Sequence, residues 1–450
     1  MMMPPDLFPA QYMLYRGNRM STEKELIRNI ENGDYDEKFR WLYCLTGEDT
    51  GKERERYIHV LSGLLSHYGE HPDTALFSAP GRTEIGGNHT DHQHGAVLCA
   101  SVNTDMIAAA GKNGTGTVRL LSEGYGEVLI STDDLSVREE EKNTTASLVR
   151  GICHAFSERG ACVSGLDIYM TSDVPKGSGV SSSAAFEVLM ANIFSAFFCD
   201  KGTAPDAVEI AKIGQYAENV YFGKPSGLMD QMASSVGGAV YIDFHDPENQ
   251  LVESLNLNLS EAGLSLCIVD SGADHADLTG EYAAVPEECR QVASLLGASV
   301  LGDIPYTVFM ENLPRLRGNC PDRALLRAIH FYDDTERARK EAEALRKKDY
   351  DTFLSLVNAS GDSSFEYLQN ITPAGSIRHQ DVALTIAILR KALRGKGAVR
   401  VHGGGFAGTV QAFVPLSDLS RFMEFTERIT GPGSCHVMSV RPAGGIRIDS

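Results

Sequence analysis

The chain has 450 residues, 42% hydrophobic and 22% charged, which is typical of a globular protein large enough for two domains. Its formal net charge is -19, a field that repels phosphate-coated polymers and argues against nucleic acid as a partner. Nine scattered cysteines without a Cys-x-x-Cys pair disfavour disulfides and structural zinc. Because no apolar run of about 18 residues exists, we expect no membrane span and a cytoplasmic protein.

The N-terminal segment predicts helices without chemistry. Its first residues lack the charged and apolar regions of a signal peptide. Thr22 and Glu25 have the spacing of a capping box, and a second apolar periodicity runs to Gly69, a natural helix end. We therefore expect residues 1–55 to form a helical extension, before a domain at 56–250 and another at 251–450.

A polar segment, residues 81–95, separates two predicted strands at 76–80 and 97–102. It is longer than a hairpin needs, so its polar groups are free to bind a hydroxyl-rich ligand, although a solvated turn remains the alternative. Three histidines at 89, 92 and 94 raise the possibility of a metal site, which no neighbouring cluster supports. The polar side chains of interest are Arg82, Glu84, Asn88, His89, Asp91 and His92.

A glycine- and serine-rich stretch, residues 175–187, follows a predicted strand at 166–170 and opens a helix-forming run. A helix start presents unpaired N–H groups and partial positive charge, and glycine lets the backbone approach a ligand closely. This arrangement predicts a phosphate site, with a serine-capped helix as the alternative. The loop residues are Gly177, Ser178, Gly179, Val180, Ser181, Ser182 and Ser183.

Two further glycine-bearing segments follow. Residues 223–234 place Asp230 in a mostly uncharged stretch, where it is either a helix cap or a functional carboxylate.

Between the two segments, helices are expected at 287–296, 322–331, 335–346 and 382–393, and the alternating charges at 336–348 fit an exposed helix. Residues 402–408 hold more glycine than a turn between two strands requires. Three glycine-rich loops beside a polar hairpin suggest a nucleotide-dependent transferase, although neither a Walker sequence nor the protein-kinase motifs are present.

The order of these motifs resembles the GHMP small-molecule kinases, and specifically their galactokinase branch, over about residues 56–450. Residues 79–82 (Ala-Pro-Gly-Arg) with 89–91 (His-Thr-Asp) look like the family's sugar signature, and residues 175–185 look like its phosphate loop. Residues 217–218 with 227–231 look like its catalytic segment, 280–282 like its sugar-contacting tyrosine region, and 403–408 like its third motif. The resemblance implies an α+β fold of two domains with the active site in the cleft between them.

The resemblance also implies roles for single residues. ATP phosphates would lie on the loop from Gly177 to Ser183, with Mg²⁺ held by Ser183 and Glu218. Asp230 would accept the proton of the anomeric hydroxyl, and Arg82 would keep Asp230 ionised and stabilise the transferred phosphoryl group. The implied sugar contacts are Asn88, His89, Asp91, Gly227 and Tyr282.

Some positions depart from the galactokinase pattern. Asn88 stands where a sugar-contacting glutamate is usual, and Glu84 stands where an asparagine is usual. Val285 and Pro286 replace paired arginines, Ala407 replaces a glycine, and residues 91–93 resemble plant galacturonokinases. Without the charge at position 88, a sugar carboxylate would be tolerated as well as a hydroxyl.

The sequence therefore predicts an ATP- and Mg²⁺-dependent kinase for the anomeric hydroxyl of galactose or a close relative. A galacturonate or other modified-sugar kinase is the alternative within the class, and a sugar sensor with little turnover is the alternative outside it. The expected partners are the sugar and ATP, with neither nucleic acid nor a membrane. The pattern leaves open whether the chain is a monomer or a dimer.

Overall fold

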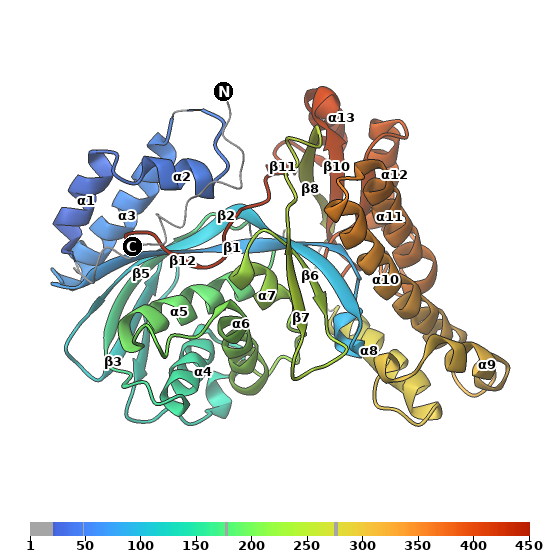
Figure 1. Ribbon diagram of the computed structural model, residues 1–450, viewed down its shortest axis with the longest axis horizontal. Coiled ribbons are helices and arrows are strands. Elements are labelled where there is room, and N and C mark those ends of the chain that lie inside the picture. Colours follow the sequence, from blue (N-terminus) through green and yellow to red (C-terminus); the bar gives the residue numbers. More distant parts are fainter. Residues whose placement is uncertain (1–20, 48, 176–178, 274–277) are drawn as a thin grey trace.

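A computed structural model describes residues 21–47, 49–175, 179–273 and 278–450 (Figure 1). Within these residues the strands form an eight-stranded sheet and a four-stranded antiparallel sheet. The strands are β1 (Thr74–Gly86), β2 (Ala96–Lys112), β3 (Thr117–Ser122), β4 (Val128–Ser131), β5 (Leu166–Ser172), β6 (Ala239–Asp243), β7 (Leu251–Leu255), β8 (Leu264–Ala273), β9 (Ala398–Val401), β10 (Gly408–Pro415), β11 (Cys435–Met438) and β12 (Ile446–Arg447).

Most helices pack on the two sheets. The helices are α1 (Glu23–Glu31), α2 (Asp36–Leu42), α3 (Gly51–Tyr68), α4 (Thr145–Glu158), α5 (Ser182–Phe198), α6 (Ala207–Tyr216), α7 (Met229–Val236), α8 (Thr279–Leu295), α9 (Tyr306–Leu316), α10 (Asp322–Arg346), α11 (Tyr350–Ser363), α12 (Asp381–Leu393) and α13 (Leu419–Thr430). Of these, α8 and α9 pack with the first half of α10. The described part of the chain contains no helix with the length and apolarity needed to cross a membrane.

The centre of the large sheet is buried on both faces, because the long strands β1 and β2 alternate their side chains between two helical layers. Leu76 of β1 and Ile107 of β2 pack against α1 and α3, whereas Phe77 and Ala108 face the core shared with α4 and α5. Figure 1 shows α1–α3 on one side of β1 and β2, and α4–α7 on the other. The sheet order β12-β1-β2-β5-β3-β4, with β6 and β7 beyond the first half of β2, makes β1 and β2 its centre.

The expected capping box is confirmed at the start of α1, where Thr22 and Glu25 bond each other's backbone. The helices expected in the second half are confirmed as α8, α10 and α12, and one continuous α10 contains both predicted segments at 322–346. α12 and α13 cover one face of the small sheet, which has the order β11-β8-β10-β9. α11 packs on its other face through Phe353, which contacts Phe413 of β10.

The predicted polar hairpin is shorter than its sequence suggests. β1 continues through Gly86, so Arg82 and Glu84 lie on a strand, and the loop spans only residues 87–95. Irregularities in the pairing with β2 at 80/82 and 84/86 adjust the strand on either side of these two residues.

The domain limits stay a prediction. β7 pairs with β6, so the large sheet extends past the expected boundary at residue 250, and β12 returns the C-terminal segment to β1. α3 begins at Gly51, within the predicted extension, and packs on the large sheet together with α1.

Candidate active site

Asp230 is the meeting point of three segments. It lies in the first turn of α7, and its two oxygens accept from Arg82 of β1, with Nε to Oδ1 at 2.6 Å and Nη2 to Oδ2 at 2.7 Å. Ser181 of the phosphate loop donates to Oδ2 at 2.6 Å. The Arg82 side chain also donates to the Gly179 carbonyl, and the Arg82 backbone N–H donates to Val180 O at 3.0 Å. The two residues expected to perform the chemistry are thus in direct contact beside the loop.

The charges around Asp230 keep it ionised. Burial by itself would raise its pKa, but the charge of Arg82, the hydrogen bonds from Arg82 and Ser181, and the charge of Lys224 hold that pKa below its ordinary value. Arg82 is only 6% exposed, and Asp230 correspondingly raises the pKa of the guanidinium against the effect of burial. A carboxylate in this state accepts a proton when a hydroxyl in contact with it reacts.

The described part of the phosphate loop joins two cavities. Residues 176–178 lie outside the described residues, so Gly177 and Ser178 are not placed. Gly179 and Ser181 have positive φ angles of 68° and 55°, and α5 begins at the next residue, Ser182. Ser181 contacts Asp230, which lines a cavity of about 1040 Å³, whereas Ser182 and Ser183 line a second cavity of about 410 Å³. Val180 is buried and does not line either cavity.

The second cavity has a largely apolar wall beside the start of α5. Its wall includes Met106, Leu120, Tyr125, Leu148, Met170 and Phe186. A flat aromatic group suits such a wall, and the N-terminus of α5 next to it favours an anion.

Glu218 has oxygen neighbours but also a cation. It lies in the π-helix η3 (Ala217–Phe222), where its Oε2 accepts from Ser226 at 2.6 Å and from Gln231 at 2.9 Å. Its Oε1 contacts the Lys224 ammonium at 2.9 Å. Glu218 lines the first cavity and Ser183 the second, so the structure does not place both predicted metal ligands in one cavity. Among the described residues no three His, Cys, Asp or Glu side chains gather as a metal cluster, which also disfavours a histidine site at 89, 92 and 94.

The chemistry of these two oxygen donors fits Mg²⁺, although they line different cavities. One carboxylate and one hydroxyl suit a metal that takes most of its oxygens from water and substrate phosphates, and the ammonium on Oε1 shows that this carboxylate accommodates a cation.

Most predicted sugar contacts line the first cavity. Asp91, in the short helix η1 (Asp91–Gln93), lies against Gly227, where a Cβ would come within 1.8 Å of its Oδ2. Glycine is therefore required there if Asp91 is to approach the loop before α7. His89 bonds Gly404 O at 2.9 Å, and burial followed by the nearby His92 lowers its pKa to about 4, so the ring is neutral. Tyr282 donates to Gly405 O at 2.9 Å.

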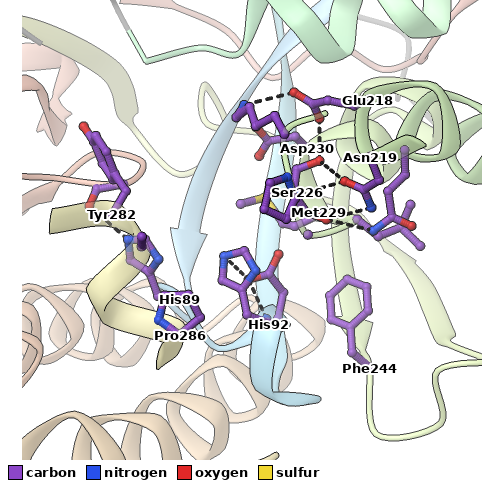
Figure 2. Close-up of a pocket in the computed structure, with 18 of the residues that line it drawn as sticks. His89, His92, Glu218, Asn219, Ser226, Met229, Asp230, Phe244, Tyr282 and Pro286 are labelled. Atoms are coloured by element: carbon purple, nitrogen blue, oxygen red, sulfur yellow. Dashed lines mark hydrogen bonds and ion pairs between the residues drawn. The ribbon is translucent and has the colours of Figure 1, made fainter. Parts of the chain in front are cut away.

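Figure 2 shows how these groups surround the cavity. Glu218, Asp230 and Ser226 gather on one side, His89 and His92 lie across from them, and Tyr282 and Pro286 approach from α8. Side chains from both halves of the chain thus line one cavity, as the predicted cleft requires.

Asn88 requires a correction. It is fully buried and does not line the cavity. Its Nδ2 donates to Glu84 Oε1 at 2.8 Å and Gly403 O at 2.9 Å, while its Oδ1 accepts from Asn370 at 2.8 Å and Ser364 at 3.2 Å. Because the protein itself satisfies this amide, no hydrogen-bonding position is left for a sugar. The neighbouring Glu84 lines the cavity instead.

Sequence reasoning missed several residues that contact the candidate site. Lys224 and Ser226 follow Glu218 by six and eight residues, a spacing that has no meaning until the loop after η3 turns back. Arg400 was visible as a charged residue in the apolar strand β9, and the structure places its Nη2 2.6 Å from Glu84 Oε1.

Comparisons with known proteins agree with this geometry. Residues 65–112 match the galactokinase galactose-binding signature, and residues 147–238 match the GHMP kinases N terminal domain. A galactokinase of Actinobacillus pleuropneumoniae serotype 3 is 30% identical over 356 residues, covering 78% of this chain and 87% of the relative. A galactokinase of Streptomyces coelicolor is 29% identical over 389 residues, covering 84% and 95%.

The solved structures agree on the fold. The Lactococcus lactis galactokinase complexed with galactose superposes with a TM-score of 0.73 at 22% identity, covering 86% of this chain and 98% of that one. Fold and site together define a GHMP kinase, which confirms the predicted α+β class. The chain belongs to the galactokinase family, and it is a sugar phosphotransferase.

Proposed function

We propose that this chain transfers the γ-phosphoryl group of ATP to the anomeric hydroxyl of galactose. The observation that carries the proposal is the phosphate loop. Ser181 contacts Asp230, which lines the first cavity with its many polar side chains, and the next two residues line the apolar cavity. A nucleotide base bound in the apolar cavity and a sugar bound in the polar one would thus meet at the start of α5. The galactose-binding signature and the galactokinase relatives support galactose as the acceptor.

The residues on the page account for the reaction. The C1 oxygen of the sugar forms a bond to the γ-phosphorus, the bond from that phosphorus to the bridging oxygen of ADP breaks, and the proton of the C1 hydroxyl goes to a carboxylate oxygen of Asp230. Arg82 holds Asp230 as the anion and brings a positive charge beside the loop that faces the phosphates. Positioning and charge stabilisation are the main requirements of phosphoryl transfer.

Magnesium is the expected cofactor. Ser183 and Glu218 would hold it, and the metal would neutralise phosphate charge. Lys224 contacts Glu218, and its charge helps to lower the pKa of Asp230. It therefore supplies further positive charge on the same side of the cavity.

Asp91, His89 and Tyr282 are the proposed sugar contacts, with Gly227 providing the space that Asp91 needs. The galacturonate alternative receives no support from the geometry, because the carboxylate of Glu84 already lines the cavity.

ADP release measured with galactose, galacturonate, N-acetylgalactosamine and arabinose tests the proposal. We expect galactose to give the highest kcat/KM. No turnover of galactose above background would refute the proposal, and turnover of galacturonate in its place would establish the modified-sugar alternative. Binding of galactose without any ADP release would establish the sensor.

A further inference from the structure

We propose that Glu84 is the carboxylate that binds a hydroxyl of the sugar, held in position by Arg400 and Asn88. This specificity-determining role rests on the proposed function and adds a residue to the sugar site. It also removes Asn88 from direct contact with the substrate and makes it a positioning residue.

Glu84 lies on the same face of β1 as Arg82. Arg82, Thr83 and Glu84 pair without interruption with Ser101, Ala100 and Cys99 of β2. Successive side chains alternate across a sheet, so Glu84 points to the same side as Arg82, roughly 7 Å further along the strand. Both line the first cavity. A pyranose whose C1 hydroxyl contacts Asp230 therefore extends along β1 toward Glu84.

The two carboxylate oxygens of Glu84 have different surroundings. Its Oε1 receives both Arg400 Nη2 at 2.6 Å and Asn88 Nδ2 at 2.8 Å, and each of these donors is fully buried. Among the described residues no hydrogen bond joins Oε2 to the protein. The two buried donors thus fix Oε1, and Oε2 remains available to a ligand in the cavity. Such a preorganised acceptor binds a hydroxyl without having to reorient.

The sequence pattern agrees with this assignment. Positions 84 and 88 have exchanged the asparagine and glutamate of the usual galactokinase pattern, and the exchanged side chains touch. The loss of charge at position 88 therefore does not leave the pocket neutral. A sugar carboxylate approaching Glu84 would bring two like charges together, so a neutral hexose is favoured.

The test compares Glu84→Gln with the matched control Glu341→Gln. Glu341 is an equally buried carboxylate on α10 that approaches Gly86 at the end of β1, but it does not line the cavity. Because hydrogen bonds to a charged acceptor are about twice as strong as neutral ones, we expect Glu84→Gln to raise the KM for galactose about tenfold. The kcat and the nucleotide affinity should change little, and the ratio of galacturonate to galactose turnover should rise. Glu341→Gln should leave all four quantities unchanged.

Galactose derivatives that lack one hydroxyl each identify the bond itself. Removal of the hydroxyl that contacts Glu84 should weaken binding to the wild-type chain about tenfold and have little effect on Glu84→Gln. An unchanged galactose KM in Glu84→Gln, or equal losses with every derivative in both chains, would overturn the assignment. If Glu84→Gln does not fold, Glu84→Asp is measured instead. It keeps the charge but is one methylene shorter, so it should bind galactose more weakly than wild type while retaining the preference over galacturonate.

Failure of the proposed function would be seen separately, as a wild-type chain that does not phosphorylate galactose. Calorimetric binding of the same sugars to wild type and Glu84→Gln would still decide the role of Glu84. Equal affinities for every sugar that binds would overturn it, and weaker binding to the variant would support it.

Discussion

Replacing Asp230 with asparagine perturbs both the chemistry and the stability of the site. The carboxylate accepts three short hydrogen bonds, two from Arg82 and one from Ser181. An amide accepts through one oxygen only, so at least one donor would face the NH₂ group. The buried guanidinium would also lose its counter-charge. Losing one partner of a buried pair costs about 3–5 kcal/mol, and solvent screening of the 30%-exposed Asp230 side chain reduces this to about 2–3 kcal/mol.

The catalytic loss should exceed the loss of stability. A positioned general base contributes about 10²- to 10⁴-fold, so we expect ADP release with galactose to fall at least about a hundredfold in Asp230→Asn. Calorimetry should show that the sugar still binds. The matched control is Glu253→Gln, which removes an exposed two-bond pair with Arg346, at 2.8 and 2.6 Å, and should leave the rate unchanged. A rate for Asp230→Asn within about tenfold of wild type would refute the assignment of Asp230 as the base.

The pH dependence of stability gives a second measure of the same contact. The folded-state pKa of Asp230 is lowered, so its contribution is fully present above the unfolded-state pKa of about 3.9 and is lost as the pH falls through the folded value. The difference in free energy of unfolding between wild type and Asp230→Asn should therefore be constant near neutral pH and shrink in acid. A difference that persists unchanged at the lowest pH would contradict the pairing.

Three further predictions concern other contacts. Hydrogen bonds to Asp167 and Glu23 raise the pKa of His71 to about 9. In urea unfolding, His71→Gln should therefore lose about 3 kcal/mol of stability at pH 6, and this loss should vanish as the pH rises through 9. A loss that does not depend on pH would contradict the pairing. Glu218→Gln should raise the Mg²⁺ concentration for half-maximal turnover at least about tenfold while leaving metal-free nucleotide binding unchanged, and an unaltered Mg²⁺ titration would remove Glu218 from the metal site. Asn88→Glu would bring a second buried carboxylate against Glu84 and should cost about 3 kcal/mol in urea unfolding. Adding Glu84→Asn in a double variant should restore most of this stability. Additive losses would show that the two side chains do not interact.

The sequence indicated what depends on local patterns. The strands predicted at 76–80 and 97–102, the helix after the serine-rich loop and the capping box at Thr22 follow from residue types a few positions apart. The motif order also indicated the family, and with it the meeting of Arg82 and Asp230, which are 148 residues apart.

The arrangement around Asn88 was not predictable from local patterns. Asn370 and Ser364, from the segment after α11, bond Asn88, and Arg400 from β9 bonds its partner Glu84. None of these three residues has a fixed spacing to the hairpin. The sequence shows the departure from the family pattern at position 88, but it does not show how that departure changes the charge of the pocket. A missing charge at position 88 was counted as a missing charge in the pocket, whereas the strand alternation of β1 places Glu84 there.

Phosphorus NMR of the product formed from ATP, Mg²⁺ and galactose is the most direct measurement of the central claim. The account predicts one new phosphate signal that is coupled to the anomeric proton, grows with ADP, and is absent from the Asp230→Asn reaction. A phosphate on any other hydroxyl, or ADP release without a phosphorylated sugar, would contradict it.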